Sequence, residues 1–330
     1  MKCQCLFTIP AVEGAYSHQG HRMMAGGRKK FPAQVAFTRA SLFSDRNDEA
    51  KLPSFSISGH QDKIVLSLYR GKLVFSGEHG LPGQYILKPI PSMPGLPFVK
   101  DVPANEHLCM HISDRLFGHK TASSCLITMA DGEPAYITKR FDYNEKGEKY
   151  AQEDFCQFLN RSPDSHGKNY KYDVTYEEIM RAISHVSSAP LLDKIELLKY
   201  IVFSYAIGNG DAHAKNFSVM SDGNEVMLTP SYDVLQTQLH FPSEDRMALD
   251  LFSNGYETEG YKTNGFLTGT CFREFAKKHR IPQHVYEEVI TNPVRLKDQL
   301  KQYVDASFLS HEAKIPFMKN VNDRIKALSQ

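Results

Sequence analysis

A glycine-rich segment near the middle of the chain places a carboxylate and an amide at a spacing that suits phosphoryl transfer. It runs from Gly208 to Asn216 and reads Gly-Asn-Gly-Asp-Ala-His-Ala-Lys-Asn. Asp211 and Asn216 stand in the relation Asp-x₄-Asn, which kinases use for a base that orients the acceptor hydroxyl and an amide that holds Mg²⁺. The transfer needs a carboxylate near the incoming oxygen and a neutral metal ligand. The segment therefore predicts Asp211 as catalytic base and Asn216 as metal ligand.

Two further residues extend this constellation downstream of Asp211. His213 follows two positions later and could hydrogen-bond the transferred phosphate. Asp233 comes seventeen residues after Asn216, within Thr-Pro-Ser-Tyr-Asp-Val, where a second and charged metal ligand is required. A strand, a turn and a strand between the two would bring both to one Mg²⁺. Asp233 is therefore predicted as the other metal ligand.

Upstream residues supply the groups that would hold nucleotide phosphates. Lys88 ends a strand-like run, where its point charge could reach the phosphates of ATP, and Glu106 on the following helix suits an ion pair with it. The loop at 56–63 is rich in small residues, which let backbone N–H groups approach phosphates. Each piece alone also fits an ordinary loop, hairpin turn or surface lysine. Their order along the chain favours the chemical interpretation.

The segments before residue 142 have the pattern of a small sheet. Strands are expected at 64–69, 73–75, 84–88, 124–128 and 135–139, with Asp131-Gly132 as the turn between the last two. A helix is expected at 105–117, ending at Gly118. Beyond residue 150 the apolar period becomes helical, with helices expected at 152–159, 176–185 and 191–207 and over the last sixty residues.

This order predicts an α+β, bilobal protein-kinase-like fold, with a small sheet-rich N-lobe and a larger helical C-lobe. We expect an N-terminal extension of uncertain role at 1–50, the N-lobe with phosphate loop and lysine at 51–142, and the C-lobe with catalytic loop and metal motif at 143–330. Ligands often bind where two such units meet.

Composition narrows the class of protein. Of 330 residues 41% are hydrophobic and 23% charged, which is typical of a globular protein. The net charge of +1 lacks the basic excess of a chain that grips nucleic acid by itself, so no direct nucleic-acid binding is expected. Six scattered cysteines favour a reducing compartment, and no apolar run approaches the roughly 20 residues of a membrane span. We therefore expect a cytoplasmic protein without membrane contact.

Taken together, the motifs resemble the HipA-type serine/threonine kinases, toxins of bacterial toxin–antitoxin systems. The loop at 56–63 is similar to the phosphate loop of that family, and Tyr-Ile-Leu-Lys at 85–88 to its ATP lysine. Lys-Arg-Phe-Asp at 139–142 resembles its hinge, and Glu-Asp-Phe-Cys-Gln at 153–157 a following helix. Residues 208–217 resemble its catalytic loop, and Tyr-Asp-Val at 232–234 its metal motif. Six motifs in order make the resemblance specific.

The resemblance implies a set of site residues. Asp211 would be the base, Asn216 and Asp233 would bind Mg²⁺, and Lys88 would contact the α- and β-phosphates of ATP. Further ATP contacts would come from His213, from Gln157, from backbone around Lys139 and Phe141, and from the phosphate loop with Ser56, Ser58 and Gly59. In the family a serine of this loop is autophosphorylated and silences the enzyme. The matching serine is Ser56 and Ser58 is a second candidate, while Ser54 stays open.

The short front end resembles the HipT type of this family. Only about fifty residues precede the phosphate loop, whereas long HipA kinases carry roughly a hundred more. In the HipT type the missing subdomain is a separate HipS-like small protein, encoded with a HipB-like DNA-binding antitoxin. Substrates in the family are aminoacyl-tRNA synthetases, and the short front end favours the tryptophanyl over the glutamyl enzyme. Lys139 departs from the glutamate of the best-known members.

Three alternatives stay open at the level of sequence. The chain could be a small-molecule or lipid kinase, which would place phosphate on a metabolite and none on protein. It could be a non-catalytic module that binds ATP without turnover, although the Asp211 and Asp233 pair argues against this. Zn²⁺ could be bound by a separate set of residues, although Cys-x-Cys is tighter than the usual finger spacing. That set is Cys3, Cys5, His18 and His21.

Overall fold

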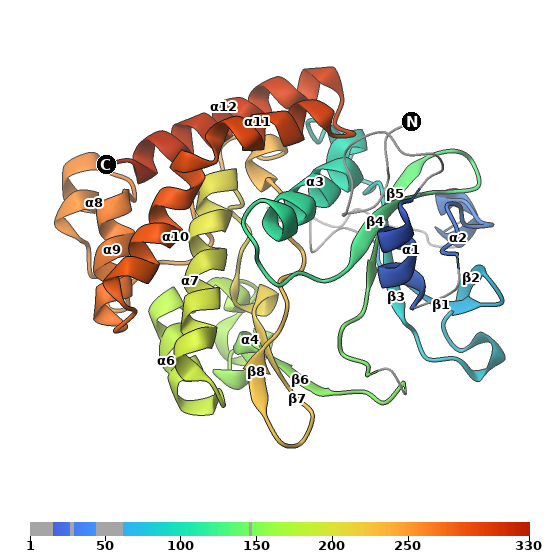
Figure 1. Ribbon diagram of the computed structural model, residues 1–330, viewed down its shortest axis with the longest axis horizontal. Coiled ribbons are helices and arrows are strands. Elements are labelled where there is room, and N and C mark those ends of the chain that lie inside the picture. The colour runs from blue at the N-terminus through green and yellow to red at the C-terminus, as the bar shows by residue number, and fades with distance from the viewer. Residues whose placement is uncertain (1–15, 27–29, 44–61, 145–146) are drawn as a thin grey trace.

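The chain forms two lobes of unequal size (Figure 1). The computed structural model describes residues 16–26, 30–43, 62–144 and 147–330. A twisted sheet makes up most of the smaller lobe, and a group of helices makes up the larger one. The described part of the chain therefore has the α+β, bilobal plan that the sequence predicts.

The smaller lobe contains an antiparallel sheet in the order β2-β1-β3-β5-β4. Its strands are β1 (Ile64–Tyr69), β2 (Lys72–Phe75), β3 (Tyr85–Pro89), β4 (Ser124–Thr128) and β5 (Pro134–Lys139). Apolar side chains such as Leu66, Leu87 and Ile137 are fully buried between the sheet and the segment that contains α1 (His18–Ala25). All five strands lie where the sequence predicts them, with ends that differ by one residue.

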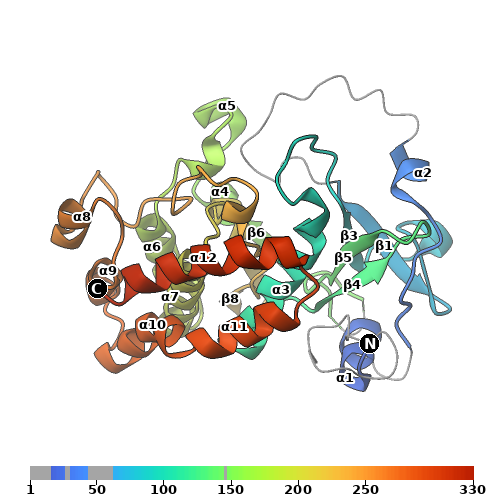
Figure 2. The ribbon, with the colours of Figure 1, turned by 90° about the horizontal axis from the view of Figure 1, so that it is seen from above.

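Helices of the larger lobe surround α7 (Pro190–Ile207), which packs against α6 (Tyr176–Val186), α10 (Gln283–Arg295) and α12 (His311–Leu328). Most of α7 is buried, because apolar residues occupy nearly all of its sides. The remaining helices are α2 (Arg39–Phe43), α3 (Val102–Arg115), α4 (Phe155–Phe158), α5 (Pro163–His166), α8 (Glu259–Asn264), α9 (Gly269–Lys278) and α11 (Lys297–Ala306). Seen from above, α3 lies between α11 and α12 and the sheet (Figure 2).

The helix expected at 152–159 is wrong in its first half. Residues Ala151–Asp154 form β6, and only Phe155–Phe158 form the short helix α4. β6 pairs with β7 (Ser218–Ser221), which pairs in turn with β8 (Val226–Leu228). Asp154 ends the strand and caps α4, because its carboxylate accepts a hydrogen bond from the Gln157 N–H. The secondary structure of this segment depends on its pairing with a distant strand. Local periodicity in the sequence does not reveal such pairing.

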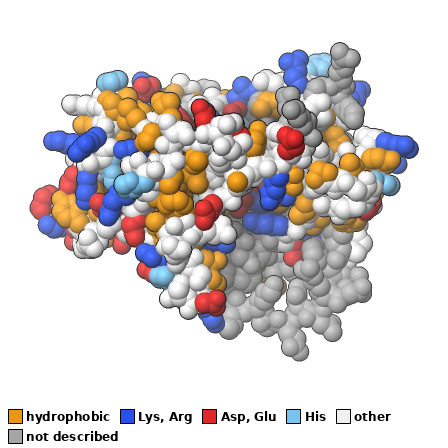
Figure 3. All heavy atoms as spheres, turned by 90° about the horizontal axis from the view of Figure 1, so that it is seen from below, with side chains coloured by type: hydrophobic (Ala, Val, Ile, Leu, Met, Phe, Trp, Pro, Cys, Tyr) orange, Lys and Arg blue, Asp and Glu red, His pale blue; other side chains and the backbone are white. Residues whose placement is uncertain are grey.

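Three properties of the described residues bear on the expectations from composition. Cys109, Cys125, Cys156 and Cys271 are buried free thiols. None of the helices described in the structure is long and apolar enough to cross a membrane. On the face shown in Figure 3, basic and acidic side chains are interspersed rather than gathered by sign.

Candidate active site

A buried lysine at the end of β3 joins the two lobes. Lys88 is 3% exposed, and its Nζ lies 2.5 Å from Oε1 of Glu106 on α3, which is the ion pair expected from the sequence. The same Nζ contacts Oδ1 of Asp233. Lys63 approaches the other oxygen of Asp233, with 3.2 Å between Nζ and Oδ2. Residues separated by as many as 170 positions therefore meet in one cluster.

Lys88 and Asp233 hold each other in the ionised state. Burial alone would lower the pKa of Lys88, but the carboxylates of Asp233 and Glu106 raise it. Burial opposes ionisation of Asp233 too, yet Lys88 and Lys63 outweigh it and lower its pKa. For Glu106 burial prevails and raises the pKa to about 7. A permanently charged Lys88 and Asp233 suit a site for phosphates and a cation.

The segment predicted to be catalytic begins directly where α7 ends. Gly208 takes the left-handed conformation (φ 75°) that ends many helices, and glycine adopts it without steric cost. The Asp211 N–H then donates to the side-chain oxygen of Asn209 at 3.2 Å, and the Tyr176 hydroxyl donates to the Ala212 carbonyl at 2.8 Å. These bonds fix the backbone on both sides of Asp211.

Three side chains surround the carboxylate of Asp211, which is 6% exposed. The hydroxyl of Tyr172 donates to Oδ1 at 2.5 Å, and Nζ of Lys171 lies 4.0 Å from that oxygen. Nε2 of His213 is 3.8 Å away. Sequence reasoning missed Tyr172 and Lys171. The sequence feature that could have indicated these two residues is the run Asn-Tyr-Lys-Tyr at 169–172. Its aromatic and basic residues fit neither a helical nor a strand period.

A hairpin of β7 and β8 brings the two expected metal ligands into one region. The hydroxyl of Tyr232 donates to the Lys215 carbonyl at 2.9 Å and lies 2.7 Å from the hydroxyl of Ser218. These bonds fasten the residue before Asp233 to the residues on either side of Asn216. Asp233 itself has a φ of 56°, which is uncommon outside glycine and is often found at functional sites.

The side chain of Asn216 has a property expected of a metal ligand. Its Oδ1 is buried and has no hydrogen-bond partner among the described residues. A buried polar atom without a partner costs free energy unless something binds it. Carboxylate and amide oxygens are the ligands that Mg²⁺ prefers. Asn216 and Asp233 therefore fit a divalent cation chemically.

His213 lies beside the carboxylate of Asp211, with 3.8 Å between Nε2 and Oδ1. It is 3% exposed, and neither ring nitrogen has a hydrogen-bond partner in the described part of the chain. Burial lowers its pKa to about 4, although the charges of Asp211 and Asp233 both act in the opposite direction. The ring is therefore neutral at pH 7, with one N–H available to a ligand.

The other residues predicted to contact ATP lie in different surroundings. Phe141 packs its ring against Tyr232, with 5.6 Å between the centroids, directly beside the Asp233 region. The Lys139 N–H bonds to the Ser123 carbonyl and its Nζ to the Met23 carbonyl, so both groups serve the smaller lobe. Oε1 of Gln157 accepts from the Asp154 N–H at 3.4 Å in the cap of α4. Neither the contacts of Lys139 nor that of Gln157 indicates a role in nucleotide binding.

Several predicted residues lie outside the described part of the chain. These are the phosphate-loop residues Ser54, Ser56, Ser58 and Gly59, together with Cys3 and Cys5. Of the histidines proposed for Zn²⁺, His18 and His21 lie on α1, and Nδ1 of His21 accepts from the Phe31 N–H at 3.0 Å. Zinc binding stays a hypothesis from the sequence.

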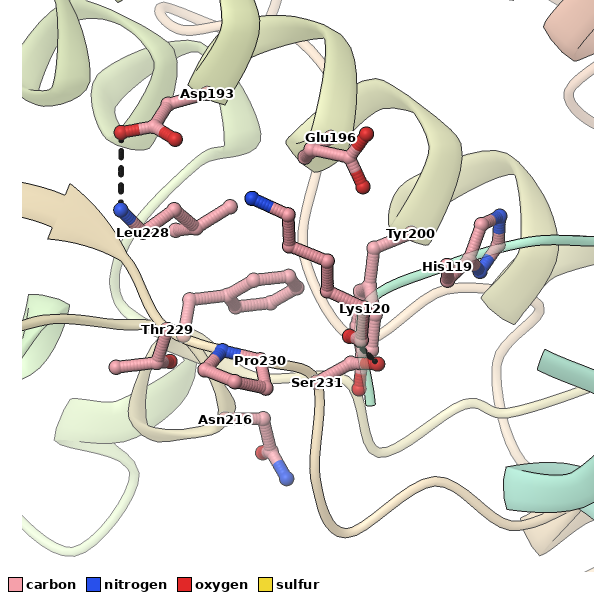
Figure 4. A pocket seen from close by; sticks show the side chains of 11 residues that line it. His119, Lys120, Asp193, Glu196, Tyr200, Asn216, Leu228, Thr229, Pro230 and Ser231 are labelled. Carbon is pink, nitrogen blue, oxygen red and sulfur yellow. Dashed lines mark hydrogen bonds between the residues drawn. The ribbon is translucent and has the colours of Figure 1, made fainter. Parts of the chain in front are cut away.

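Two cavities lie near the residues described above. The smaller, about 30 Å³, lies between α7 and the hairpin, where Asp193 accepts from the Leu228 N–H at 2.9 Å (Figure 4). It has room for little more than a water molecule. Asn216 lies at its edge, away from Asp193 and Glu196. The larger is a groove of about 870 Å³ that includes Tyr172 and residues 244–258 in its lining.

Glu244, which lines the groove, lies next to the loop that contains Gly210. The hydroxyl of Thr237 accepts from the Gly210 N–H at 2.7 Å and donates to the carboxyl group of Glu244. A Cβ at Gly210 would lie 2.7 Å from the Asp245 carbonyl oxygen and 2.7 Å from Cδ of Glu244. Only glycine therefore fits between Asn209 and Asp211.

Replacing Gly210 should displace the neighbouring Asp211. We expect Gly210→Ala to lower the free energy of unfolding by about 1–3 kcal/mol, because backbone atoms must move to make room for the methyl group. The melting temperature should fall accordingly. Ser243→Ala, at an exposed position one residue before Glu244, is the control and should leave the melting temperature unchanged. Thermal unfolding of both variants provides the measurement. Equal melting temperatures would show that the loop accommodates a methyl group.

Buried histidines predict a loss of stability in mild acid. Burial lowers the pKa of His111 and His119 to about 3, and of His213 and His240 to about 4, from 6.5. Below pH 6.5 the unfolded chain binds protons that the folded chain rejects, so acidification favours unfolding, by about 1.4 kcal/mol per group and pH unit.

Two buried carboxyl groups act in the opposite direction. Burial raises the pKa of Glu106 to about 7 and of Glu244 to about 8, from 4.5, so the folded chain holds their protons more tightly above pH 4.5. They offset part of the histidine effect between pH 6.5 and 4.5, where burial lowers the pKa of a fifth histidine, His279, to about 4 as well. We therefore expect a net loss of stability as the pH falls through this range. Chemical denaturation at a series of pH values measures this slope, and a flat profile would contradict it.

Comparisons with known proteins identify the family of this chain. A family model described as the HipA-like C-terminal domain matches residues 55–300. A candidate kinase of Haemophilus influenzae is 28% identical over 316 residues, which are 89% of this chain and 87% of that protein. The serine/threonine-protein kinase toxin HipA of Shewanella oneidensis is 25% identical over 286 residues, and the match spans 78% of this chain but only 61% of the toxin.

Solved structures show the same fold. The Shewanella oneidensis MR-1 HipA, solved with HipB and its operator DNA, superposes with a TM-score of 0.63 and 19% identity, covering 87% of this chain and 68% of that one. The Helicobacter pylori proinflammatory kinase CtkA superposes with a TM-score of 0.55 and 17% identity, covering 86% and 91%. The fold is therefore the protein-kinase-like one that the sequence predicts. Since the family model matches well over half of the residues, this chain belongs to the family of HipA-like C-terminal domains.

Proposed function

We propose that the protein is an ATP- and Mg²⁺-dependent serine/threonine protein kinase. The observation that carries the proposal is the gathering of Lys88, Asp233 and Glu106 across the two lobes, beside a loop that presents Asp211. Membership of the family and similarity to the Shewanella toxin, described as a serine/threonine-protein kinase, support the same activity.

Each residue of the cluster would have a distinct task. Lys88 would bind the phosphates of ATP as a permanently charged point cation. Asn216 and Asp233 would hold Mg²⁺, which neutralises charge on the transferred phosphoryl group when it is bound. Asp211 would orient the acceptor hydroxyl and take its proton. The neutral ring of His213 would donate a hydrogen bond to a phosphate oxygen.

We further propose that the kinase is the toxin of a toxin–antitoxin system in the cytoplasm. Its protein substrate would be an aminoacyl-tRNA synthetase, with the tryptophanyl enzyme as first candidate and the glutamyl enzyme as second. Its partners would be a HipS-like small protein and a HipB-like antitoxin. The Shewanella HipA structure, which contains HipB and operator DNA, supports the antitoxin partner. Ser56, with Ser58 as second candidate, would be autophosphorylated.

Mass spectrometry of the purified chain, before and after incubation with Mg·ATP, tests the proposal. We expect phosphate on the loop serines, and transfer from labelled ATP to a purified tryptophanyl-tRNA synthetase. Label on metabolites alone would indicate a small-molecule or lipid kinase. Nucleotide binding with no transfer, even after phosphatase treatment of the loop, would indicate a non-catalytic module.

A growth assay tests the toxin assignment separately. Induced expression of the chain should arrest growth, and co-expression of the HipB-like partner should restore it. Asp211→Asn should not arrest growth, because it would lack the base. Growth arrest by this variant to the same extent would separate the toxicity from phosphoryl transfer.

A further inference from the structure

We propose that Tyr172 is an intramolecular phosphate acceptor of this kinase. The proposal rests on the function proposed above and adds a modification site within the helical lobe. The observation behind it is the hydroxyl of Tyr172, which donates a hydrogen bond to Oδ1 of Asp211 at 2.5 Å. A kinase base makes this contact with the hydroxyl that it prepares for attack.

The local structure holds this hydroxyl in the acceptor position. Tyr172 ends a single 3-10 turn (Tyr170–Tyr172) that packs against the turn containing Asn216. Its ring meets that of His213 edge to face, with 5.4 Å between the centroids. Tyr170 lies two positions earlier, and its hydroxyl contacts Nζ of Lys215 at 3.3 Å. The turn therefore directs one of its two tyrosines to the base.

Charges around the hydroxyl suit the transfer. Lys171 directly precedes Tyr172 in the chain, and its Nζ is 4.0 Å from Oδ1 of Asp211. A cation there can neutralise oxygens of the phosphoryl group as it moves from the nucleotide to the phenol. His213, with both ring nitrogens buried and without partners among the described residues, faces the same space.

The proposed step is a single displacement. Oη of Tyr172 forms a bond to the γ-phosphorus of ATP, and the bond from that phosphorus to the β,γ-bridging oxygen breaks. ADP leaves with the electron pair, and the phenolic proton passes to the carboxylate of Asp211. The products are phosphotyrosine at position 172, ADP and a protonated Asp211, which returns its proton to water.

The groove gives the modified side chain a place to go. Phosphotyrosine carries nearly two negative charges, which the carboxylate of Asp211 repels. Tyr172 lines the groove of about 870 Å³, where Arg161 and Arg246 also lie. When the phosphotyrosine at position 172 moves into this groove, the carboxylate of Asp211 becomes free to bind the hydroxyl of another acceptor.

Site-resolved mass spectrometry after incubation with Mg·ATP tests the proposal. We expect phosphate on Tyr172 and none on Tyr170. Tyr170→Phe, the matched control from the same turn, should keep the phosphate on Tyr172, whereas Tyr172→Phe should lose all phosphotyrosine from this peptide. Phosphate on the loop serines or on an added protein, with Tyr172 unmodified, would overturn this inference and leave the proposed kinase standing. Absence of all transfer would overturn both.

A mixing experiment tests whether the acceptor is intramolecular. Isotopically heavy Asp211→Asn chain is incubated with light parental chain and Mg·ATP. The geometry predicts phosphotyrosine 172 on the light chain only, at a fractional rate that stays constant over a roughly tenfold range of protein concentration. Phosphate on Tyr172 of the heavy chain would show transfer between molecules and would refute the intramolecular assignment.

Discussion

Asp211→Asn should reduce phosphoryl transfer about 10³-fold, because the base that orients the acceptor and takes its proton is lost. The amide keeps the size of the carboxylate and can still accept the hydrogen bond of the Tyr172 hydroxyl. The loop should therefore keep its shape. Nucleotide binding should persist, because Lys88, Asn216 and Asp233 are unchanged. Transfer from labelled ATP and calorimetric titration with Mg·ATP give the two measurements.

Asp298→Asn is the matched control for this variant. Asp298 is exposed in the first turn of α11, and no contact connects it to the catalytic loop among the interactions described above. The control should transfer phosphate at the parental rate. If Asp211→Asn does the same, then Asp211 is not the base. If it loses nucleotide binding as well, the loop has been disturbed, and the loss of transfer says nothing about the base.

Asp233→Asn should weaken binding of Mg·ATP roughly 100-fold, or about 2.7 kcal/mol, because the one charged ligand of the proposed metal pair is removed. Binding of ATP in the presence of a chelator should not weaken, since Lys88 keeps its charge and its partner Glu106. Titration of ATP with and without Mg²⁺ separates these effects. The expected signature is a lost dependence on magnesium.

Asp222→Asn provides the control within the same hairpin. Asp222 is exposed in the turn between β7 and β8, where its Oδ1 accepts from the Asn224 and Glu225 N–H groups. An asparagine can make the same bonds. This variant should bind Mg·ATP like the parent. An Asp233→Asn chain with an unchanged dependence on magnesium would remove Asp233 from the metal site.

Local sequence carried enough information for the sheet, for α6 and α7, and for the residues of the catalytic loop. Alternation and helical period reflect burial on one face, and glycine or proline marks ends of α7, β3 and β5. Asp211 and Asn216 lie within one short loop, so their spacing alone indicated their chemistry. The segment 151–158 failed for the opposite reason, because its first half is a strand held by pairing with β7.

What only the tertiary structure decided is which distant groups meet. Lys88 and Asp233 are 145 positions apart, and Tyr172 reaches Asp211 across 39. The sequence determined that two carboxylates, an amide and a lysine follow one another in the order expected of a kinase. It could not show that the hydroxyl of Tyr172 contacts the carboxylate of Asp211, because such contacts depend on how distant segments pack in space.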